Sequence, residues 1–303
     1  MTGRVTPGDD WLYLKMYLGQ AVERLDALIV EVIPKVLKRD VVERWFFLRY
    51  YDQQGVHLRL RVRLAPHQSQ AAMHIQETCQ KTLDELHRLA PSDYRPMVVP
   101  PGFDPRAMLP PTAQVALVQE VYEPEHEKFG GADAMPIAEE VFEVSSGIAV
   151  QVLHDEAAGA YSRKTVAPCF LAAAREVFDS KEGASQFWRQ YTTYWLGGDT
   201  PAAQDWRQRF FDKGQQLAHA EIPIVARPAA LPQEAAPLVE RWRAALERAS
   251  SAYTRSVPLS PATAGVLAFN FAHLMNNRLG LTALEEAYLA TLLEQRAGPT
   301  RTP

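Results

Sequence analysis

A run of nine residues, Val56 to Leu64, alternates aliphatic with basic side chains without interruption. Because the side chains of a β-strand point alternately to its two faces, this run predicts a strand with one aliphatic face and one basic face. The side chains of the basic face are His57, Arg59, Arg61 and Arg63. Planar guanidinium groups suit carboxylates and phosphates, so this face predicts a site for an anion. An exposed strand whose charges meet water or pair with Asp and Glu would carry the same pattern.

The remaining strands are predicted from short aromatic and apolar segments. The run WFFLRYYD is rich in residues that favour strands, and a short turn ending at Gly55 separates it from the basic strand. These features predict a hairpin over 45–64, with Arg49 in its first strand. Two further strands are predicted near 11–17 and 114–122.

Helical spacing of apolar residues dominates the second half of the chain. Helices are predicted over residues 25–32, 68–89, 137–152, 166–178, 184–195, 202–217, 235–250, 261–276 and 283–295. Residues 90–111 are rich in proline and predict a loop, residues 221–232 predict an extended connector, and residues 297–303 predict a disordered tail. We therefore expect an α+β fold in which a small, mostly antiparallel sheet is packed with many helices.

The composition limits the partners and the compartment. The 303 residues include 32 Lys and Arg against 36 Asp and Glu, and the formal charge of −4 gives no global basic field for nucleic acid. We therefore expect no direct nucleic-acid partner. The two cysteines, Cys79 and Cys169, suggest neither a disulfide framework nor a thiolate zinc site. The sequence has no segment typical of a signal peptide or a membrane span, so we expect a cytoplasmic protein without a membrane partner.

Several common signatures of chemistry are missing from the sequence, which has no Walker loop, GxGxxG, HExxH or GxSxG motif. Besides the basic hairpin, the candidates are the turn from His126 to Gly131, which carries Lys128, and a C-terminal helix with His273 and Arg278. For His273 the alternative is a buried histidine with a structural hydrogen bond. Arg278 could equally cap carbonyl groups at the helix end, ahead of Gly280.

Five motifs taken in order carry a family resemblance. They read WFFLRYYD with HLRLR, then YEPEHEKFGG, AEEVF and HLMNNRLGL. This series resembles the C-terminal elimination domain of class I lanthipeptide dehydratases, and the resemblance extends from Trp11 to about Glu294. It implies a single elimination-type domain over 1–303. A chain of this length has no room for the large tRNA-dependent glutamylation domain of full-length dehydratases, so we expect the stand-alone form found in thiopeptide and related biosynthetic clusters.

The resemblance also implies which residues act. Carried over residue by residue, the functional groups of the elimination family are Arg59, Arg61 and His273, and Lys128 stands where the family has the arginine of an R-Y-G-G turn. We take these four as candidate catalytic residues. Ser145-Ser146 stands where the family usually has Asp-Ser. Candidate substrate-binding residues in the same motifs are His57, Arg49 and Arg278, although Arg49, like Arg63, could be an ordinary salt-bridge partner.

The family implies one of two chemistries. In glutamate elimination, a Ser or Thr of a precursor peptide, already esterified with glutamate, becomes dehydroalanine or dehydrobutyrine. In the alternative, a formal 4+2 aza-cycloaddition builds the pyridine core of a thiopeptide, with loss of the leader peptide. A non-catalytic subunit that binds the precursor peptide by β-augmentation or charge pairing is a third possibility from another class.

We expect elimination, because the developing enolate and the two carboxylates of the departing glutamate are anions that fixed arginines would stabilise. His273 could act as the base at the α-carbon or as the acid to the leaving carboxylate. Both the basic strand and this histidine are retained, whereas cycloaddition would draw on tyrosines such as Tyr50, Tyr122 and Tyr191. Lys128 and Ser145 depart from the elimination pattern.

The elimination hypothesis implies specific partners and no cofactor. The partners are a ribosomal precursor peptide, with its leader and core, and a separate glutamyl-tRNA-dependent glutamylating enzyme. A homodimer is one option for the active unit. The elimination hypothesis further requires that the guanidinium groups of the hairpin over 45–64 and the imidazole of His273 converge on a shared pocket.

Overall fold

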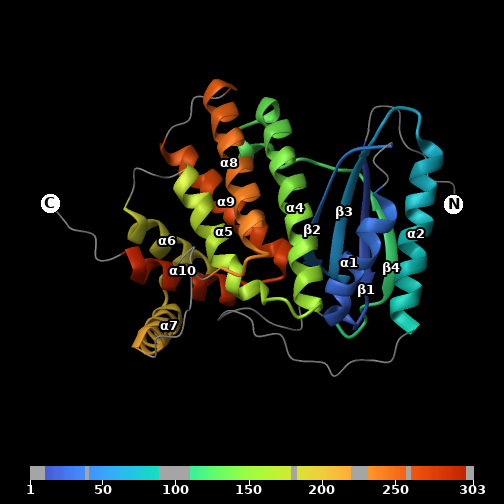
Figure 1. Cartoon of the computed structure of the whole chain (residues 1–303). Coiled ribbons are helices and arrows are strands. Elements are labelled where there is room, and N and C mark those ends of the chain that lie inside the picture. Colours follow the sequence, from blue (N-terminus) through green and yellow to red (C-terminus); the bar gives the residue numbers. More distant parts are fainter. Residues whose placement is uncertain are drawn as a thin grey trace. The chain divides into compact units, whose positions relative to one another are not determined.

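The structure is a computed structural model, and its described residues are 11–37, 41–88, 110–178, 183–219, 231–256 and 261–297 (Figure 1). These residues form two compact units, which divide the chain at Pro124 and Glu125. In the described part of the chain, the first unit contains every strand and the second unit is helical. The expected α+β class is confirmed, and a single domain over 1–303 stays a prediction.

The first unit is built on an antiparallel sheet with the strand order β2-β3-β1-β4. Its elements are β1 (Trp11–Leu18), η1 (Val22–Arg24), α1 (Leu25–Val36), β2 (Val42–Asp52), β3 (Gly55–Leu64), α2 (Ser69–Arg88) and β4 (Val115–Glu120). The basic run is therefore β3, and it pairs with β2 on one side and β1 on the other. The predicted hairpin is confirmed. Gly55 follows its turn with a positive φ of 119°, which favours glycine.

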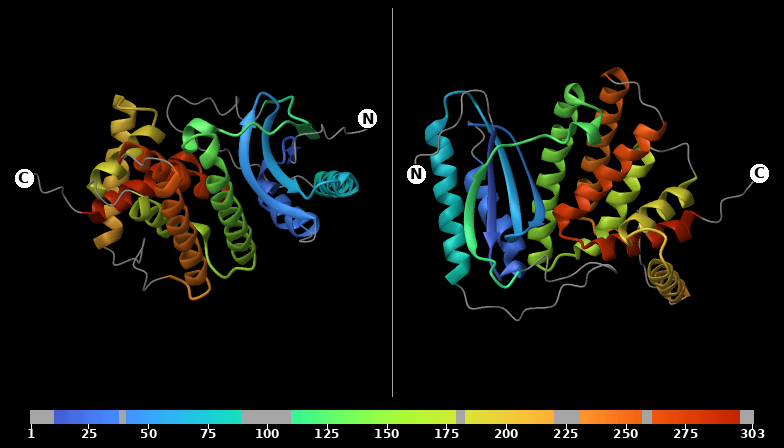
Figure 2. Two further views of the ribbon diagram at one scale, coloured as in Figure 1. Left: turned by 90° about the horizontal axis from the view of Figure 1, so that it is seen from above. Right: turned by 180° about the vertical axis from the view of Figure 1, so that it is seen from behind.

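The two faces of β3 have different environments. Helices α1 and α2 cover one face of the sheet (Figures 1 and 2). On that face the side chains of Leu58, Leu60 and Val62 are completely buried, so removal of aliphatic surface from water holds the helices and the sheet together. The alternation then places the basic side chains of β3 on the opposite face, beside the side chains of β1 and β2 that pair with them.

The second unit is a bundle of helices. Its elements are η2 (His126–Phe129), η3 (Ala132–Ala134), α4 (Met135–Ala157), α5 (Arg163–Phe178), α6 (Ala184–Trp195), α7 (Pro201–His219), α8 (Ala236–Ser256), α9 (Pro261–Leu279) and α10 (Ala283–Ala297). Helix α9 packs against α4 and α5, and α10 packs against α6 and α7 (Figures 1 and 2). No helix within the described ranges combines the length and the apolar character needed to cross a membrane.

A sharp turn joins α9 to α10 and sets the geometry of the candidate site. Gly280 has a φ of 79°, and the backbone N–H groups of Gly280 and Leu281 donate to the carbonyls of Asn277 and Asn276, which ends α9. Thr282 and Glu285 then form a reciprocal N-terminal cap on α10, with side-chain to backbone distances of 3.2 and 2.9 Å. The turn brings Glu286, in the first turn of α10, within hydrogen-bond distance of His273 and Asn276 of α9.

Some boundaries differ from the predictions. Strand β4 ends at Glu120 rather than near residue 122, because the chain leaves the sheet and Tyr122 packs on aromatic side chains instead. Helix α5 begins at Arg163, three residues before its predicted start, because Ser162 accepts a hydrogen bond from the backbone N–H of Lys164. Most of the predicted loop 90–111, connector 221–232 and tail 297–303 lies outside the described residues.

Candidate active site

Arg59 is held in a defined orientation on the basic face of β3. Its Nε donates to Nε2 of His57 over 3.2 Å, and its guanidinium carbon lies 3.4 Å from the centre of the Tyr50 ring. The terminal guanidinium nitrogens make no hydrogen bond or ion pair with the described residues. A guanidinium fixed by one hydrogen bond and one ring loses little freedom when an anion binds to its remaining donors. Arg59 is therefore suited to bind a carboxylate.

His57 supports this arginine as a neutral imidazole. The side chain is completely buried, and burial lowers its pKa to about 4, although the carbonyl of Gly55 and the charge of Asp52 oppose the decrease. At neutral pH the ring therefore carries one proton. Since Nε2 accepts from Arg59, that proton lies on Nδ1, which is 3.1 Å from the carbonyl oxygen of Gly55. This placement makes His57 a partner of Arg59, and its predicted contact with substrate stays a prediction.

The acidic groups near His57 are engaged elsewhere. The hydroxyl of Tyr17 donates to Asp52 over 2.8 Å, and Nζ of Lys15 lies 2.9 Å from Glu120 and 3.7 Å from Asp52. Burial and the neighbouring carboxylates raise the pKa of Tyr17 above its ordinary value, so its hydroxyl stays protonated and remains a donor. These pairings leave the charge of Arg59 without a carboxylate partner among the described residues.

The other arginines of the hairpin lie in different surroundings. Arg61 is 7% exposed, and its guanidinium carbon lies 4.5 Å from the centre of the Tyr13 ring and 5.0 Å from that of Tyr122. Arg63 donates to Glu43 over 3.1 Å. Arg49 pairs with Leu58 in register, on the face that the helices cover, and lies 2.6 Å from Asp26 of α1. The arrangement of Arg49 matches the salt-bridge alternative.

The imidazole of His273 lies where α6, α9 and α10 meet. Its Nδ1 is 3.0 Å from Oε1 of Glu286, and its ring packs on Trp195 with the ring centres 4.3 Å apart. The side chain is 27% exposed, whereas that of Glu286 is 1% exposed. Nε2 of His273 makes no hydrogen bond with the described residues. The imidazole thus has one nitrogen fixed by a buried carboxylate and one nitrogen available to a reactant.

Glu286 is held by further donors. The hydroxyl of Tyr191 lies 2.5 Å from its Oε2, and Nδ2 of Asn276 lies 3.4 Å from the same oxygen. Burial, with the charge of Glu286 as the second cause, raises the pKa of Tyr191 well above its ordinary value, so the phenol stays protonated. The buried carboxylate therefore accepts hydrogen bonds from Tyr191 and Asn276 and lies within hydrogen-bond distance of His273, and such partners make a buried charge tolerable.

The last two predicted residues of the second unit have local partners. Lys128 is 55% exposed in η2, and its Nζ lies 2.5 Å from Glu125. Arg278 is completely buried, and it donates to Oγ of Ser146 and to the carbonyl of Leu274, each over 3.0 Å. The carbonyl contact matches the capping alternative for Arg278. The roles of both residues toward substrate stay predictions.

The structure therefore groups the predicted residues in two sets. His57, Arg59 and Arg61 share one face of the sheet in the first unit, and His273 lies with its buried partners in the second unit. Convergence of the two sets on one pocket stays a prediction. Sequence reasoning missed Glu286, whose signal was an acidic residue among the apolar residues of α10. It also missed the stacking role of Trp195.

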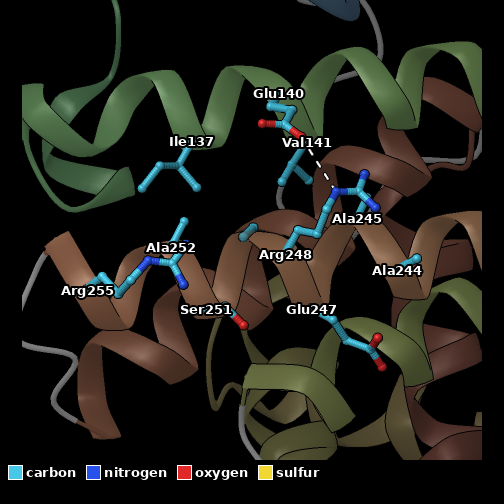
Figure 3. Close-up of a pocket in the computed structure, with 11 residues that line it drawn as sticks. Ile137, Glu140, Val141, Ala244, Ala245, Glu247, Arg248, Ser251, Ala252 and Arg255 are labelled. Atoms are coloured by element: carbon cyan, nitrogen blue, oxygen red, sulfur yellow. Dashed lines mark ion pairs between the residues drawn. The ribbon is translucent and has the colours of Figure 1, made fainter.

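A hollow of about 620 Å³ lies between α4 and α8 (Figure 3). Its lining residues are Ile137, Glu140, Val141, Ala244, Ala245, Glu247, Arg248, Ala249, Ser251, Ala252 and Arg255. Glu140 and Arg248 form an ion pair of 3.7 Å there. None of the predicted site residues lines this hollow, so we place the candidate active site elsewhere. Nor do the described residues contain a group of three His, Cys, Asp or Glu side chains that could hold a metal ion.

Comparisons with solved structures identify similar folds. The chain is similar to the tRNA-dependent lantibiotic dehydratase MibB from Microbispora sp. 107891, with a TM-score of 0.63 and 20% identity over 97% of this chain and 28% of that one. It is similar to the pyridine synthase TbtD from thiomuracin biosynthesis, with a TM-score of 0.70 and 17% identity over 96% and 98% of the two chains. It is also similar to TsrL, with a TM-score of 0.62 and 14% identity over 95% and 93%.

At these identities the solved structures show a shared fold, and the chain spans only 28% of the length of MibB. A search of curated proteins finds no match to the sequence. A model of the family described as lantibiotic biosynthesis dehydratase C-term matches residues 11–297, which is nearly the whole chain. The chain therefore belongs to the lantibiotic biosynthesis dehydratase C-terminal family.

Proposed function

We propose that this protein is a lyase that eliminates glutamate from glutamylated Ser or Thr residues of a ribosomally made precursor peptide. The observation that carries the proposal is the environment of His273, whose Nδ1 faces a buried carboxylate and whose Nε2 is available. Such an imidazole is suited to proton transfer, and elimination requires removal of the α-proton of the esterified residue. The products are a dehydroamino acid in the peptide and free glutamate.

The bonds change in a balanced way. A base takes the proton from Cα, the electron pair of that C–H bond forms the Cα=Cβ double bond, and the Cβ–O bond breaks. The departing glutamate takes the electrons of the broken bond and leaves as a carboxylate. No oxidant, reductant or added group is consumed, so the reaction calls for acid and base catalysis and for stabilisation of negative charge.

Arg59 and Arg61 would stabilise that negative charge. Arg59 is fixed by His57 and Tyr50 while its terminal donors stay available, which suits two-point binding of a carboxylate. Arg61 is packed among aromatic rings, which strengthens its electrostatic attraction for an anion because water is excluded. We assign both arginines to the carboxylates of glutamate or to the enolate oxygen, and Lys128 to a weaker supporting charge.

A second candidate is pyridine synthesis by formal 4+2 aza-cycloaddition. The similarity to TbtD, whose full length the chain nearly matches, favours this reaction. So does the departure from the elimination motifs at Lys128 and Ser145. The arginines of β3 favour elimination instead, because a cycloaddition has no glutamate to release, and the pairing of Glu286 with His273 suits removal of an α-proton.

Incubation of the full chain with two synthetic peptides tests the proposal. The first carries one glutamyl-Ser residue, and the second carries dehydroalanines and azoles. We expect mass spectrometry to show loss of a glutamate from the first peptide and no change in the second. Conversion of the second peptide to a pyridine with an unchanged first peptide would instead establish the cycloaddition. Binding of both peptides without conversion would support a non-catalytic subunit.

The separate glutamylating enzyme enters the proposal as the source of the substrate. We assign it to the class of glutamyl-tRNA-dependent enzymes, because the esterified residue must be made before it is eliminated. Coupled incubation of that class of enzyme with this protein and an unmodified precursor should give the dehydrated peptide, whereas either protein alone should not.

A further inference from the structure

We propose that Glu286 is a positioning residue that fixes the proton of the neutral His273 imidazole on Nδ1, so that Nε2 acts as the base at the α-carbon. The inference rests on the proposed function, and it chooses between the base and acid roles that the sequence leaves open. The proposal also explains why a carboxylate is buried at this position, since the packing of the helices alone does not require one.

The hydrogen bonds around Glu286 determine the direction of donation. An ionised carboxylate only accepts hydrogen bonds, whereas a phenol and a primary amide can donate them. Oε2 receives the hydroxyl of Tyr191 at 2.5 Å and Nδ2 of Asn276 at 3.4 Å. Oε1 is then left for Nδ1 of His273, 3.0 Å away, which must donate to complete the set. A neutral imidazole that donates from Nδ1 has no proton on Nε2.

The placement of the ring makes Nε2 the accessible nitrogen. The ring packs against Trp195 at 4.3 Å between centres and 35° between planes, so one face of the imidazole is covered. Nδ1 points to a carboxylate that is 1% exposed, while the whole His273 side chain is 27% exposed. Nε2 has no hydrogen-bond partner among the described residues and is not one of their buried unpaired atoms, so it lies on the exposed part of the ring, where a reactant can approach.

The carboxylate also stabilises the product of the proton transfer. When Nε2 takes the α-proton, the imidazole becomes a cation with protons on both nitrogens. Nδ1–H then donates to an anion rather than to a neutral acceptor, which favours the transfer in the direction of elimination. The arrangement thus fixes the orientation and the tautomer of the ring before the reaction and stabilises its charge afterwards.

The test measures the tautomer directly. We suggest ¹⁵N-histidine labelling of the full chain and NMR at a pH where the imidazole is neutral, with His273 assigned by comparison with His273→Asn. The proposal expects a protonated Nδ1 and an unprotonated Nε2 in the wild-type protein. A resting imidazole with its proton on Nε2 would overturn it. This measurement needs no variant of Glu286 to fold.

Kinetics of Glu286→Gln provides the second measurement. The amide has the same shape but no charge, so we expect kcat to fall at least about 10-fold with little change in KM, because the residue acts through His273 and not on the substrate. We also expect the fraction of His273 with its proton on Nδ1 to fall. An unchanged kcat and an unchanged spectrum would contradict the proposal.

Glu285→Gln is the matched control. Glu285 precedes Glu286 on the same helix, but its carboxylate caps Thr282 and lies 2.6 Å from Lys164. Glutamine can take the same position in this N-terminal cap, so we expect the variant to keep the spectrum of His273 and the rate of the wild type. If the wild-type protein fails to release glutamate from any peptide, the proposed function fails, while the NMR measurement still decides the role of Glu286.

Discussion

The two units hold their candidate groups by the same physical means. In each, one buried hydrogen-bond partner fixes one nitrogen and an aromatic ring covers one face. Arg59 of the first unit is held by the imidazole of His57 and the ring of Tyr50. His273 of the second unit is held by the carboxylate of Glu286 and a tryptophan ring. The difference lies in the charge of the buried partner.

That difference determines what each group can do. A neutral partner orients Arg59 without cancelling its charge, so the guanidinium can bind an anion through its terminal donors. An anionic partner fixes the orientation of the His273 ring and holds its proton on Nδ1, so that Nε2 can take a proton from the substrate. We infer that the first unit supplies charge and the second unit moves a proton, and the variants below test this division.

The largest expected effect is that of His273→Ala. Loss of the base should lower the rate of glutamate release at least about 100-fold, since general bases contribute about 10²- to 10⁴-fold. Mass spectrometry should show that the glutamylated peptide accumulates, while fluorescence anisotropy should show that it still binds. His154→Ala, which changes an exposed histidine of α4, is the control. If His273→Ala kept the wild-type rate, the inference that the second unit carries out the proton transfer would be wrong.

Arg59→Gln should have the next largest effect, and on binding rather than on proton transfer. A charge-assisted hydrogen bond contributes about 1.5–3 kcal/mol, so the KM for the glutamylated peptide should rise about 10- to 100-fold. Arg59→Lys should not restore it, because lysine has neither the planar fork nor the Nε–H that His57 accepts. Arg63→Gln, which alters an arginine paired with Glu43, is the control. Equal KM values for Arg59→Gln and Arg63→Gln would contradict the assignment of charge to Arg59.

The sequence predicts the first unit better than the second. Because side chains along a strand alternate between its two faces, the sequence alone predicts that Arg59 and His57 lie on the same face. The orientation of the Arg59 guanidinium cannot be predicted from the alternation, because the Tyr50 ring that it packs on belongs to β2 and its position depends on the register of the hairpin. Even so, the pairing of Tyr50 with His57 follows from a short turn, which limits the possible registers.

The surroundings of His273 depend on tertiary packing. Asn276, one helical turn away, could be named from spacing. Glu286 lies beyond the α9–α10 turn, and its approach depends on the end of one helix at Gly280 and the start of the next at Thr282. The sequence shows both the glycine that ends α9 and the threonine that begins α10, and these residues predict a turn but not the angle between the two helices. Tyr191 belongs to α6 and could not have been placed from the sequence.

His57 offers a test through pH. Burial lowers its pKa from about 6.5 to about 4, so as the pH falls the unfolded chain takes up a proton before the folded chain does. The stability contributed by the neutral ring is therefore present above pH 6.5 and is lost between pH 6.5 and 4. Compared with His57→Gln, which cannot titrate, the wild type should lose at most about 2 kcal/mol more between pH 7 and pH 5. Urea unfolding at both pH values measures this, and parallel losses would show that the partner of Arg59 is not a buried neutral imidazole.

Lys128 should show the smallest effect. Its exposed ion pair with Glu125 contributes at most about 1 kcal/mol, so Lys128→Ala should keep the unfolding temperature of the wild type, as should the control Lys35→Ala. If Lys128 supports the reaction as a diffuse charge, Lys128→Ala should lower turnover at most about fivefold, and Lys128→Arg should restore it. A loss as large as that of His273→Ala would mean that the second unit also binds the anion through a fixed cation. The division between charge in one unit and proton transfer in the other would then be wrong.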